Sequence, residues 1–322
     1  MKAVVQDNYG SPDDLELRDI DKPVVKDDEV LIRVHAASVN AADWHYMRGM
    51  PYIARLSLGL RKPKSKVRGR DVAGQVEAIG KDARRFRPGD EVYAEVDTGS
   101  FAEYTCVPED VVGLKPANLT FEQAAAVPLA AVTALQGLRD KGQIQPGQKV
   151  LINGASGGVG TFAVQLAKSF GADVTGVCST KKVDMVRSIG ADQVIDYAQE
   201  DFTQNGQRYD ILFDLVGNRS LSDCRRALTP KGTLVLSGGE GGRWLGSVSL
   251  LIKALLLSPF VGQKLRAFLA KTKHEDLLVL QELIEAGKIT PVIDKTYPLS
   301  EAPEAIRYLE ERHVRGKVVI TV

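Results

Sequence analysis

The clearest chemistry in the sequence lies in a glycine-rich run that begins at Gly154. The run is Gly154-Ala155-Ser156-Gly157-Gly158-Val159-Gly160, between the apolar residues 150–152 and a helix-forming segment from Thr161. Such a turn suits pyrophosphate, because small residues let the backbone approach the phosphates and free N–H groups at the helix start face negative charge. We predict a dinucleotide site with contacts from Ser156, Gly157, Gly158 and Val159. The alternative is a glycine turn that serves only helix–strand packing.

The residues after the next predicted strand favour NADPH over NADH. An NAD site carries Asp or Glu about 20 residues beyond the glycine run, where the carboxylate binds the ribose. This chain has Cys178-Ser179-Thr180-Lys181-Lys182 there. Hydroxyl and ammonium groups suit an additional phosphate, whereas a carboxylate would repel it. The alternative is that Lys181 and Lys182 belong to a solvated helix start.

The elements around the glycine run predict two kinds of domain. Residues 149–236 alternate apolar strands with helical segments, which indicates right-handed βαβ crossovers and a parallel sheet covered by helices on both faces. Residues 1–120 show short alternating runs separated by turns such as Arg87-Pro88-Gly89-Asp90, the pattern of an antiparallel, β-rich barrel. The period changes at Thr120-Phe121-Glu122-Gln123, which resembles a capping box at a helix start.

Composition narrows the class of protein. The chain has 322 residues, more than one core usually organises, and 42 Lys+Arg against 41 Asp+Glu, so no global field favours nucleic acid. Its three cysteines form no C-x-x-C pair, which argues against a disulfide framework and favours a reducing compartment. The apolar residues 248–262 are interrupted by Lys253 and Pro259, so we expect no transmembrane segment and a cytoplasmic protein.

Five further motifs carry a family resemblance. They are Ala37-Ser38-Val39-Asn40-Ala41-Ala42-Asp43, Gly69-Arg70-Asp71-Val72-Ala73-Gly74, Phe86-Arg87-Pro88-Gly89-Asp90-Glu91-Val92, Gly99-Ser100-Phe101-Ala102-Glu103-Tyr104 and Arg315-Gly316-Lys317-Val318-Val319-Ile320. Together with the glycine run they make the whole chain resemble the medium-chain dehydrogenase/reductase superfamily, within it the zinc-free quinone oxidoreductase-like group. The resemblance implies an α/β fold: a GroES-like β-barrel domain (residues 1–120 and 288–322) and an inserted Rossmann-fold domain with a doubly wound parallel sheet (residues 121–287).

The resemblance also implies cofactor contacts and the absence of zinc. Lys182 and Tyr197 match positions that hold the 2′-phosphate of NADPH in similar reductases, with Ser179 nearby, and Thr133 is a candidate contact to the carboxamide or ribose. Zinc-dependent relatives have Cys in the segment matched by Asn40 and a Gly-His-Glu motif matched by Gly69-Arg70-Asp71, so two ligands are missing, whereas a catalytic zinc needs three.

Without a metal, the acceptor must be activated by its own conjugation. A quinone or an α,β-unsaturated carbonyl takes a hydride at carbon and develops negative charge on oxygen, which needs hydrogen-bond donors. The candidates are Asn40, at the family's cleft position, and Tyr46, His45 and Tyr52; the family's usual tyrosine falls on His45 without a gap and on Tyr46 with a shift of one residue. For each, a structural hydrogen bond is the alternative.

We therefore predict a zinc-independent, NADPH-dependent quinone or enone oxidoreductase. The alternative is a non-enzymatic NADPH-binding protein with a redox-sensing or structural role, because a fold does not fix chemistry. We expect a small hydrophobic carbonyl or quinone substrate and a homodimer.

Two segments are unusual for the family. Residues 55–70 hold seven basic residues and no acidic one, which suits an anionic substrate, acidic lipid or a solvated loop. Residues 244–268 are rich in Leu, which suits a pocket wall, a dimer contact, a membrane-surface helix or buried structure. Peripheral membrane contact therefore stays open.

Overall fold

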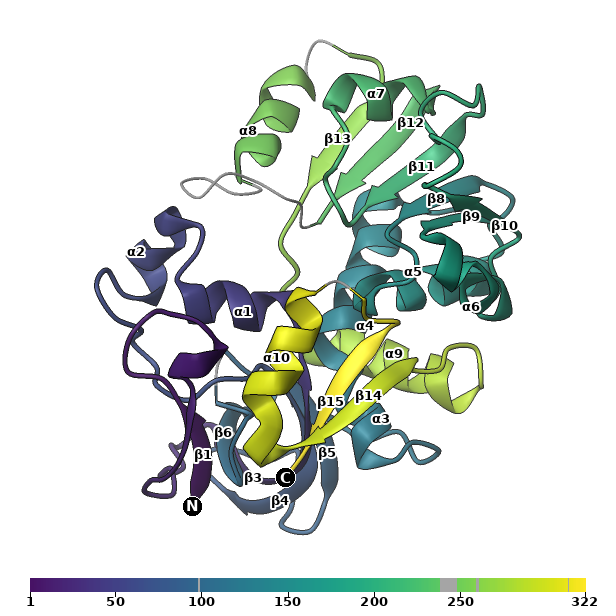
Figure 1. The fold of residues 1–322 in the computed structure, drawn as a ribbon. Helices are drawn as coiled ribbons and strands as arrows, with labels where there is room; N and C mark the ends of the chain where they lie inside the picture. The colour runs from purple at the N-terminus through teal and green to yellow at the C-terminus, as the bar shows by residue number, and fades with distance from the viewer. Residues whose placement is uncertain (98, 238–247, 259–260, 312) are drawn as a thin grey trace. The chain divides into compact units, whose positions relative to one another are not determined.

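The chain divides into two compact units (Figure 1). The computed structural model describes residues 1–97, 99–237, 248–258, 261–311 and 313–322. Unit 1 contains residues 1–132, 272–287 and 291–322, and unit 2 contains residues 133–271 and 288–290. The predicted division of the chain placed residues 121–287 in one domain, whereas residues 121–132 and 272–287 pack with unit 1.

Three hydrogen bonds explain why residues 272–287 belong to unit 1. The helix α9 (His274–Glu285) accepts a bond from Tyr93 Oη at the carbonyl of Leu277, 2.9 Å away, and one from the Asn118 side chain at the carbonyl of Ile284. His274 Nδ1 lies 2.7 Å from the carbonyl oxygen of Val112. These contacts join residues distant in sequence, so helical periodicity could not reveal them.

Unit 1 is built on a seven-stranded sheet in the order β14-β15-β3-β4-β5-β7, with β6 also paired to β3. Its strands are β3 (Glu29–Val39), β4 (Asp71–Ile79), β5 (Glu91–Glu95), β6 (Tyr104–Pro108), β7 (Val112–Leu114), β14 (Ile293–Pro298) and β15 (Lys317–Thr321). All pairs are antiparallel except β14 with β15. The N-terminal region and the last strands therefore form one sheet, as predicted, although β14 was not foreseen.

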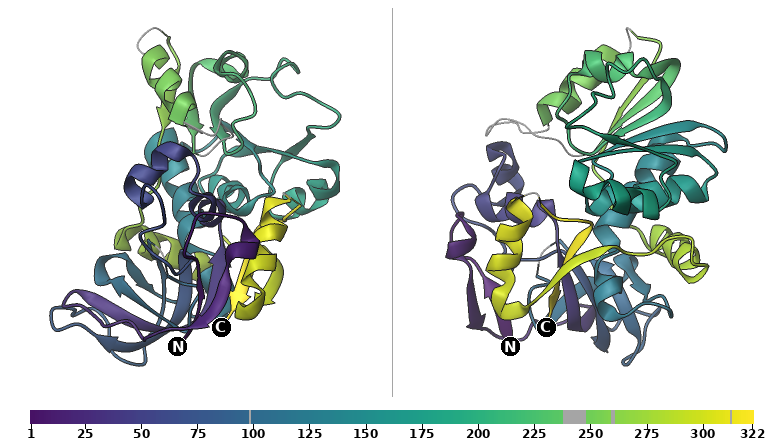
Figure 2. Two further views of the ribbon diagram at one scale, coloured as in Figure 1. Left: turned by 60° about the vertical axis from the view of Figure 1, so that its left-hand side comes forward. Right: turned by 45° about the vertical axis from the view of Figure 1, so that its right-hand side comes forward.

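Shorter elements complete unit 1. They are the hairpin partners β1 (Lys2–Val5) and β2 (Glu16–Asp19) and the helices α1 (Ala41–Arg48), α2 (Arg55–Leu58), α3 (Phe121–Ala125), α10 (Ala302–Glu310) and α4 (Pro128–Leu135), of which the residues from Thr133 onward belong to unit 2. The capping box at Thr120 and Gln123 starts α3 as predicted. Both views of Figure 2 show α10 beside β14 and β15.

The longest strand, β3, sits in the middle of this sheet and carries the alternation that the sequence shows. Val30, Ile32 and Val34 are buried in an apolar cluster with side chains of β4 and β5. The strand ends at Val39, and the next residue, Asn40, is the N-cap of α1. This junction between β3 and α1 positions polar residues of the candidate active site.

Unit 2 is a parallel sheet of six strands in the order β10-β9-β8-β11-β12-β13. The strands are β8 (Lys149–Asn153), β9 (Asp173–Cys178), β10 (Gln193–Asp196), β11 (Tyr209–Asp214), β12 (Leu228–Leu236) and β13 (Lys264–Ala267). Numbered along the chain, this order is 3-2-1-4-5-6, the doubly wound order of dinucleotide-binding folds. The predicted parallel sheet is confirmed.

The helices of unit 2 follow the predicted alternation. They are α5 (Gly158–Ser169), α6 (Val183–Ser188), α7 (Leu221–Arg226) and α8 (Val248–Leu257), and a π-helix over Gln136–Gly142 follows α4. α5 packs on β8 and β9, while Cys224 of α7 and Ala254 of α8 join the apolar cluster beneath β11 and β12.

The leucine-rich stretch at 244–268 contains a helix and a strand. Residues 244–247, 259 and 260 lie outside the described residues, whereas α8 and β13 are described. β13 gave no strand pattern in the sequence because it is a four-residue strand at the end of the sheet, and two of its residues are Lys264 and Arg266. Among the described helices, none is long and apolar enough to cross a membrane.

Candidate active site

The glycine run of unit 2 is shaped by two close approaches. Gly154 has a φ of +91°, and a Cβ there would lie 2.8 Å from Val216 Cγ2. A Cβ on Gly160 would lie 2.1 Å from the carbonyl oxygen of Gly154. Only glycine fits at either position, because the turn needs a left-handed residue and α5 packs directly on it.

Gly157 is different because its neighbourhood is open. It is the N-cap of α5, and a Cβ there would meet only Gly154 O, at 3.6 Å. The first N–H groups of a helix have no partner within it, so the amides of Gly158 and Val159 can bind an anion. The predicted contacts from Ser156 to Val159 thus lie together at one helix start, and the cradle fits a pyrophosphate.

The three residues predicted to hold a 2′-phosphate meet at the ends of β9 and β10. Asp196 pairs with Cys178 in the sheet, and the backbone N–H of Tyr197 donates to the carbonyl of Cys178 over 3.0 Å. Ser179 follows β9, and the N–H of Lys182 donates to the Ser179 carbonyl over 2.9 Å. The Tyr197 side chain is 57% exposed. These three residues therefore lie at the same edge of the sheet although they are separated in the sequence.

A carboxylate that sequence reasoning missed stands beside this set. Asp196 accepts hydrogen bonds from Thr180 Oγ1 at 2.6 Å and from the N–H of Ala198 at 3.0 Å. Burial raises the pKa of the Cys178 thiol to about 11, and Asp196 adds to the rise while Lys182 opposes it. The strand ends therefore hold both signs of charge.

A second missed group lies where β8 and β11 are neighbours. Asn153 Nδ2 donates to Asp214 Oδ1 over 2.8 Å, and the same oxygen accepts the N–H groups of Val216 and Gly217. This pair fixes the loop that follows β11, against which Gly154 packs. Thr133, the remaining predicted cofactor contact, is a buried residue of α4.

Unit 1 contains a buried polar network centred on Asp71. Asp71 Oδ2 accepts hydrogen bonds from Ser38 Oγ at 2.8 Å and Asn40 Nδ2 at 2.9 Å, and Oδ1 accepts the N–H of Leu129 at 2.9 Å. Lys317 Nζ lies 3.2 Å from Asp71 Oδ2 and also donates to Asn40 Oδ1. The side chains of Lys317 and Asp71 are 2% and 0% exposed. A buried charge must be paired, and here each has its partner.

Both polar atoms of the Asn40 side chain are therefore hydrogen-bonded to other residues of the protein. Its amide nitrogen donates to Asp71 and, at 3.4 Å, to the carbonyl of Ser38, and its oxygen accepts from Lys317. The predicted role of Asn40, a donor to a substrate oxygen, requires an amide hydrogen that these bonds already use. In this structure Asn40 instead connects β3, α1, β4 and β15.

Asp43 extends the network into α1. Its Oδ2 accepts the backbone N–H of Asn40 over 2.7 Å, in a capping box. Burial raises the pKa of Asp43 to about 7, although that hydrogen bond and the charge of Arg70 favour the ionised form. Asp43 is thus a carboxyl group whose charge changes near neutral pH.

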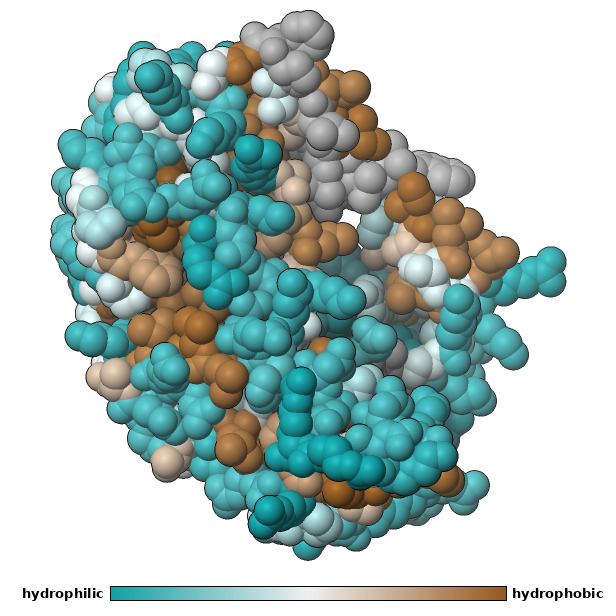
Figure 3. Space-filling model, turned by 180° about the vertical axis from the view of Figure 1, so that it is seen from behind, coloured by the Kyte–Doolittle hydropathy of each residue, from teal (hydrophilic) through white to brown (hydrophobic). Residues whose placement is uncertain are grey.

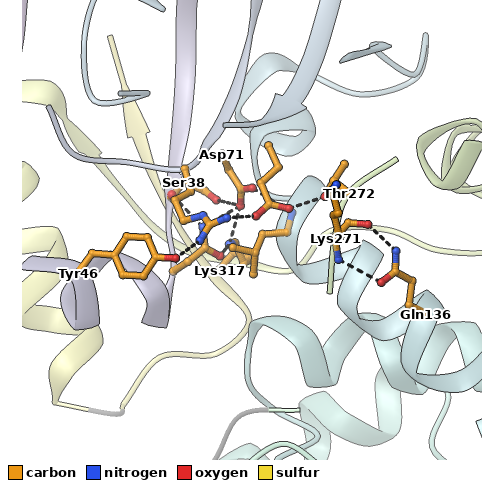
Figure 4. Close-up of polar contacts among 11 residues, drawn as sticks. Ser38, Tyr46, Asp71, Gln136, Lys271, Thr272 and Lys317 are labelled. Atoms are coloured by element: carbon orange, nitrogen blue, oxygen red, sulfur yellow. Dashed lines mark hydrogen bonds and ion pairs between the residues drawn. The ribbon is translucent and has the colours of Figure 1, made fainter. Parts of the chain in front are cut away.

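Arg70 holds the phenol of Tyr46 (Figure 4). Arg70 Nη1 donates to Tyr46 Oη over 2.8 Å, and Nη2 donates to Glu95 Oε1 over 2.6 Å. Glu95 in turn accepts from Thr272 Oγ1. Burial raises the pKa of Glu95 above its usual value, whereas Arg70 lowers it. In unit 2, Gln136 bonds the backbone N–H and carbonyl of Lys271, also drawn in Figure 4.

This arrangement leaves the Tyr46 hydroxyl hydrogen for another acceptor, because its oxygen accepts from Arg70. A phenol that accepts from a guanidinium is polarised as a donor. Of the four predicted catalytic residues, Tyr46 has the geometry of an oriented donor. His45 stacks on Trp44 at 3.8 Å between ring centroids, and Tyr52 packs against the guanidinium of Arg55.

The sequence feature that could have indicated this network is a charged residue at the start of an apolar strand. Asp71 begins an apolar strand and Lys317 begins another, and a charge at a buried strand position needs a partner. The pairing itself could not be derived, because Lys317 and Asn40 are 277 positions apart.

The positions that match zinc ligands of the zinc-dependent relatives carry residues of other chemical types. Asn40 bonds Lys317, and Arg70 presents a cation. Within the described ranges, no group of three His, Cys, Asp or Glu residues is placed to hold a metal ion.

Comparisons with known proteins agree with both units. The family model "Alcohol dehydrogenase GroES-like domain" matches residues 26–117, and "Zinc-binding dehydrogenase" matches residues 189–320. The NADPH-dependent alkenal/one oxidoreductase of Arabidopsis thaliana is 36% identical, over 99% of this chain and 79% of the relative. The 2-methylene-furan-3-one reductase of Solanum lycopersicum gives the same identity and coverage.

A solved structure supports the same relationship across the full length. The quinone oxidoreductase from Coxiella burnetii matches with a TM-score of 0.86 and 32% identity, covering 100% of this chain and 99% of that one. With its mostly antiparallel seven-stranded sheet, its 3-2-1-4-5-6 parallel sheet and relatives over its whole length, the chain belongs to the medium-chain dehydrogenase/reductase superfamily, in the quinone oxidoreductase-like group.

Proposed function

We propose that this protein is an NADPH-dependent oxidoreductase that reduces the conjugated carbonyl of an enone or a quinone. The observation that carries the proposal is the Tyr46 phenol, fixed by Arg70 as a hydrogen-bond donor. The glycine cradle and the residues Ser179, Lys182 and Tyr197 provide the groups that NADPH needs. Relatives named as alkenal/one, furanone and quinone reductases support the same chemistry.

NADPH, when bound, supplies a hydride to the electron-poor carbon of the acceptor. The residues of the chain handle the charge that then develops on the acceptor's oxygen. Tyr46 donates a hydrogen bond to that oxygen, and the guanidinium of Arg70 polarises the phenol as the negative charge grows, so the proton stays on Tyr46. Glu95 and Thr272 hold Arg70 in place, so the donor is oriented before the reaction begins.

Asn40 has a positioning role in this proposal. It accepts from Lys317 and donates to Asp71, and it caps the helix that carries Tyr46. Asn40→Asp would add a further buried carboxylate to the network that already holds Asp71 and Asp43, so we expect it to lower stability as well as activity.

We propose that the reaction is zinc-independent. The support is the donor chemistry at the matched positions, where an amide bonded to Lys317 and a guanidinium stand in place of a thiolate and an imidazole. Metal analysis of the purified protein and NADPH oxidation after chelator treatment test this. Stoichiometric zinc, or activity lost to the chelator and restored by zinc, would contradict it.

The central experiment measures NADPH oxidation with a panel of quinones and enones, using a saturated ketone as the matched control. We expect turnover with conjugated acceptors only. No turnover with any acceptor, combined with tight NADPH binding, would favour the alternative of a redox-sensing or structural NADPH-binding protein.

The preference for NADPH has its own test. We expect Lys182→Ala to reduce the ratio of NADPH to NADH affinity by about tenfold, in line with one lost charge-assisted contact. Calorimetry with both nucleotides measures the ratio, and Lys181→Ala is the control. Equal affinities in the unmodified protein would contradict the assignment.

We also propose a homodimer in a reducing compartment such as the cytoplasm. Exposed Ile252 and Leu256 on α8 and the terminal position of β13 in the sheet support self-association through unit 2. Three free cysteines support the compartment. Light scattering after size-exclusion chromatography measures the oligomeric state.

A further inference from the structure

A surface of unit 1 combines exposed aliphatic side chains with exposed cations. We call it the basic–apolar surface and define it by Ile53, Leu56, Leu60, Arg61, Lys62 and Lys64. Ile53, Leu56 and Leu60 are 41%, 72% and 68% exposed. Figure 3 shows hydrophobic side chains gathered at the right-hand edge, over α2, with hydrophilic ones beside them. Exposing three large aliphatic groups in one short segment costs solubility unless something covers them.

The charge of this segment has one sign. Residues 44–70 contain no Asp or Glu. Arg61, Lys62 and Lys64 are exposed, and within the part of the chain that the structure describes no carboxylate pairs with them. Lys66, by contrast, pairs with Asp7 at 2.8 Å. The cations beside the leucines therefore keep their full charge for an external partner.

The segment is folded, so the leucines are not exposed by local unravelling. The N–H of Lys64 donates to the carbonyl of Leu58 over 2.8 Å, and Tyr9 Oη donates to the carbonyl of Gly59 over 2.7 Å. Gly59 has a φ of +119°. Arg55 is held by the carbonyl of Gly49 and stacks on the rings of Tyr9 and Tyr52. A loop that contacts only solvent would lack these hydrogen bonds and ring contacts.

We propose that the basic–apolar surface binds the surface of an anionic lipid bilayer. Exposed leucines can enter the boundary between headgroups and acyl chains while adjacent Arg and Lys contact lipid phosphates. This inference does not rest on the proposed activity, because it uses no residue of the NADPH or Tyr46 sites.

Two other partners fit the same residues less well. A second copy joined through this face by twofold symmetry would bring like charges together without carboxylates to neutralise them. A nucleic acid would use the cations but gains little from aliphatic groups, since bases stack on aromatic or guanidinium planes.

Flotation with vesicles tests the proposal on the full chain. The unmodified protein should bind vesicles of phosphatidylcholine mixed with phosphatidylglycerol, bind pure phosphatidylcholine weakly, and be released by salt. Each basic residue near an anionic surface is worth about fivefold in affinity, so Arg61→Glu/Lys62→Glu/Lys64→Glu should lower binding by at least about 100-fold. Leu56→Ser/Leu60→Ser keeps the charge and should lower binding by roughly tenfold.

The matched control reverses three charges elsewhere in unit 1. Arg84→Glu/Arg85→Glu/Arg87→Glu changes the net charge by the same amount in the loop between β4 and β5, and should retain most of the binding. Thermal unfolding checks that every variant is folded. The proposal is overturned if the protein does not bind anionic vesicles, or if the control variant loses binding as strongly.

Two outcomes would redirect the assignment and also overturn it. If Leu56→Ser/Leu60→Ser dissociates a dimer but leaves vesicle binding unchanged, the surface joins two copies. If the charge variant loses binding to a single-stranded oligonucleotide while the unmodified protein ignores vesicles, the partner is nucleic acid.

Discussion

The two polar centres of this protein are built in opposite ways. The glycine cradle of unit 2 consists of backbone groups from seven consecutive residues, Gly154 to Gly160. The centre of unit 1 consists of side chains that come from β3 and the residue after it, from β4, β5 and β15, and from Thr272, two residues before α9. A backbone site depends on the space and the backbone conformation that its glycines allow, whereas a network of buried side chains depends on the polar group of each member.

The largest expected effect tests that dependence. Lys317→Met leaves Asp71 and Asn40 without their cation, and breaking a buried pair in this way costs about 3–5 kcal/mol. We expect that loss in the free energy of unfolding of unit 1, measured by hydrogen exchange at the amides of β15. Lys149→Met, at an exposed strand position of unit 2, is the control and should change stability by no more than about 0.5 kcal/mol.

A double variant separates charge from shape in the same pair. Lys317→Met/Asp71→Asn removes both charges, so it should recover part of the lost stability. If the single and double variants are equally unstable, the charge of Asp71 is not the source of the loss and the network is held by packing.

The second effect concerns rate. Tyr46→Phe keeps the ring beside Arg70, with 5.3 Å between the guanidinium carbon and the ring centroid, but removes the donor. Loss of one oxyanion donor typically costs 10²–10³ in turnover, about 2.7–4 kcal/mol. We expect this loss for enones and a smaller one for quinones, whose product is aromatic, with NADPH affinity unchanged. Single-turnover absorbance of NADPH measures it.

The matched control for Tyr46 is Tyr52→Phe. Tyr52 lies against Arg55, so its loss should leave both rates close to those of the unmodified protein. Equal losses at Tyr46 and Tyr52, or none at Tyr46, would remove the Arg70-held phenol from the mechanism.

The contrast between the two centres explains what the sequence could predict. The glycine run is contiguous and its flanks repeat the strand–turn–helix order, so its place in the fold followed directly. Asn40 was found as a motif residue, but its partners Asp71 and Lys317 are 31 and 277 positions away, and no periodicity connects them. The predicted role therefore missed that its amide is already bonded.

The choice of hydrogen-bond donor between two adjacent residues of α1 stayed open in the sequence for the same reason. The family's usual tyrosine position left the donor open between His45 and Tyr46, which occupy adjacent positions on the helix and face different neighbours. Arg70 lies beside Tyr46, and Trp44 lies beside His45. Only the position of Arg70, the residue before β4, relative to α1 distinguishes them, and that is a tertiary property.

A third effect tests the backbone site. Gly157→Ala should fold normally, since the nearest atom to its Cβ is 3.6 Å away, but the methyl group would enter the open cradle. We expect NADPH affinity to fall roughly tenfold, about 1.4 kcal/mol, with the midpoint of thermal unfolding unchanged. Gly160→Ala should lower both, because its Cβ would overlap the carbonyl oxygen of Gly154. Unchanged affinity for Gly157→Ala would mean that the cofactor does not approach this helix start.

The last effect appears only as a function of pH and concerns the charge of Asp43. Burial raises its pKa to about 7, whereas an unfolded chain has an ordinary aspartate value near 4. Between these values the folded protein holds a proton that the unfolded chain has released, so Asp43 lowers stability progressively as the pH rises from about 4 to 7.

Asp43→Asn keeps an oxygen to accept the N–H of Asn40 and has no charge to bury. The variant should therefore gain stability relative to the unmodified protein as the pH rises across this window, by roughly 4 kcal/mol for a pKa raised from near 4 to about 7, and the difference should stay constant above pH 7. Urea unfolding of both proteins at several pH values measures it, with Asp184→Asn, an exposed carboxylate of α6, as the control that should show no such window. The opposite sign, a variant that loses relative stability as the pH rises, would mean that Arg70 and Lys317 hold Asp43 ionised and that the network carries one more negative charge than we infer.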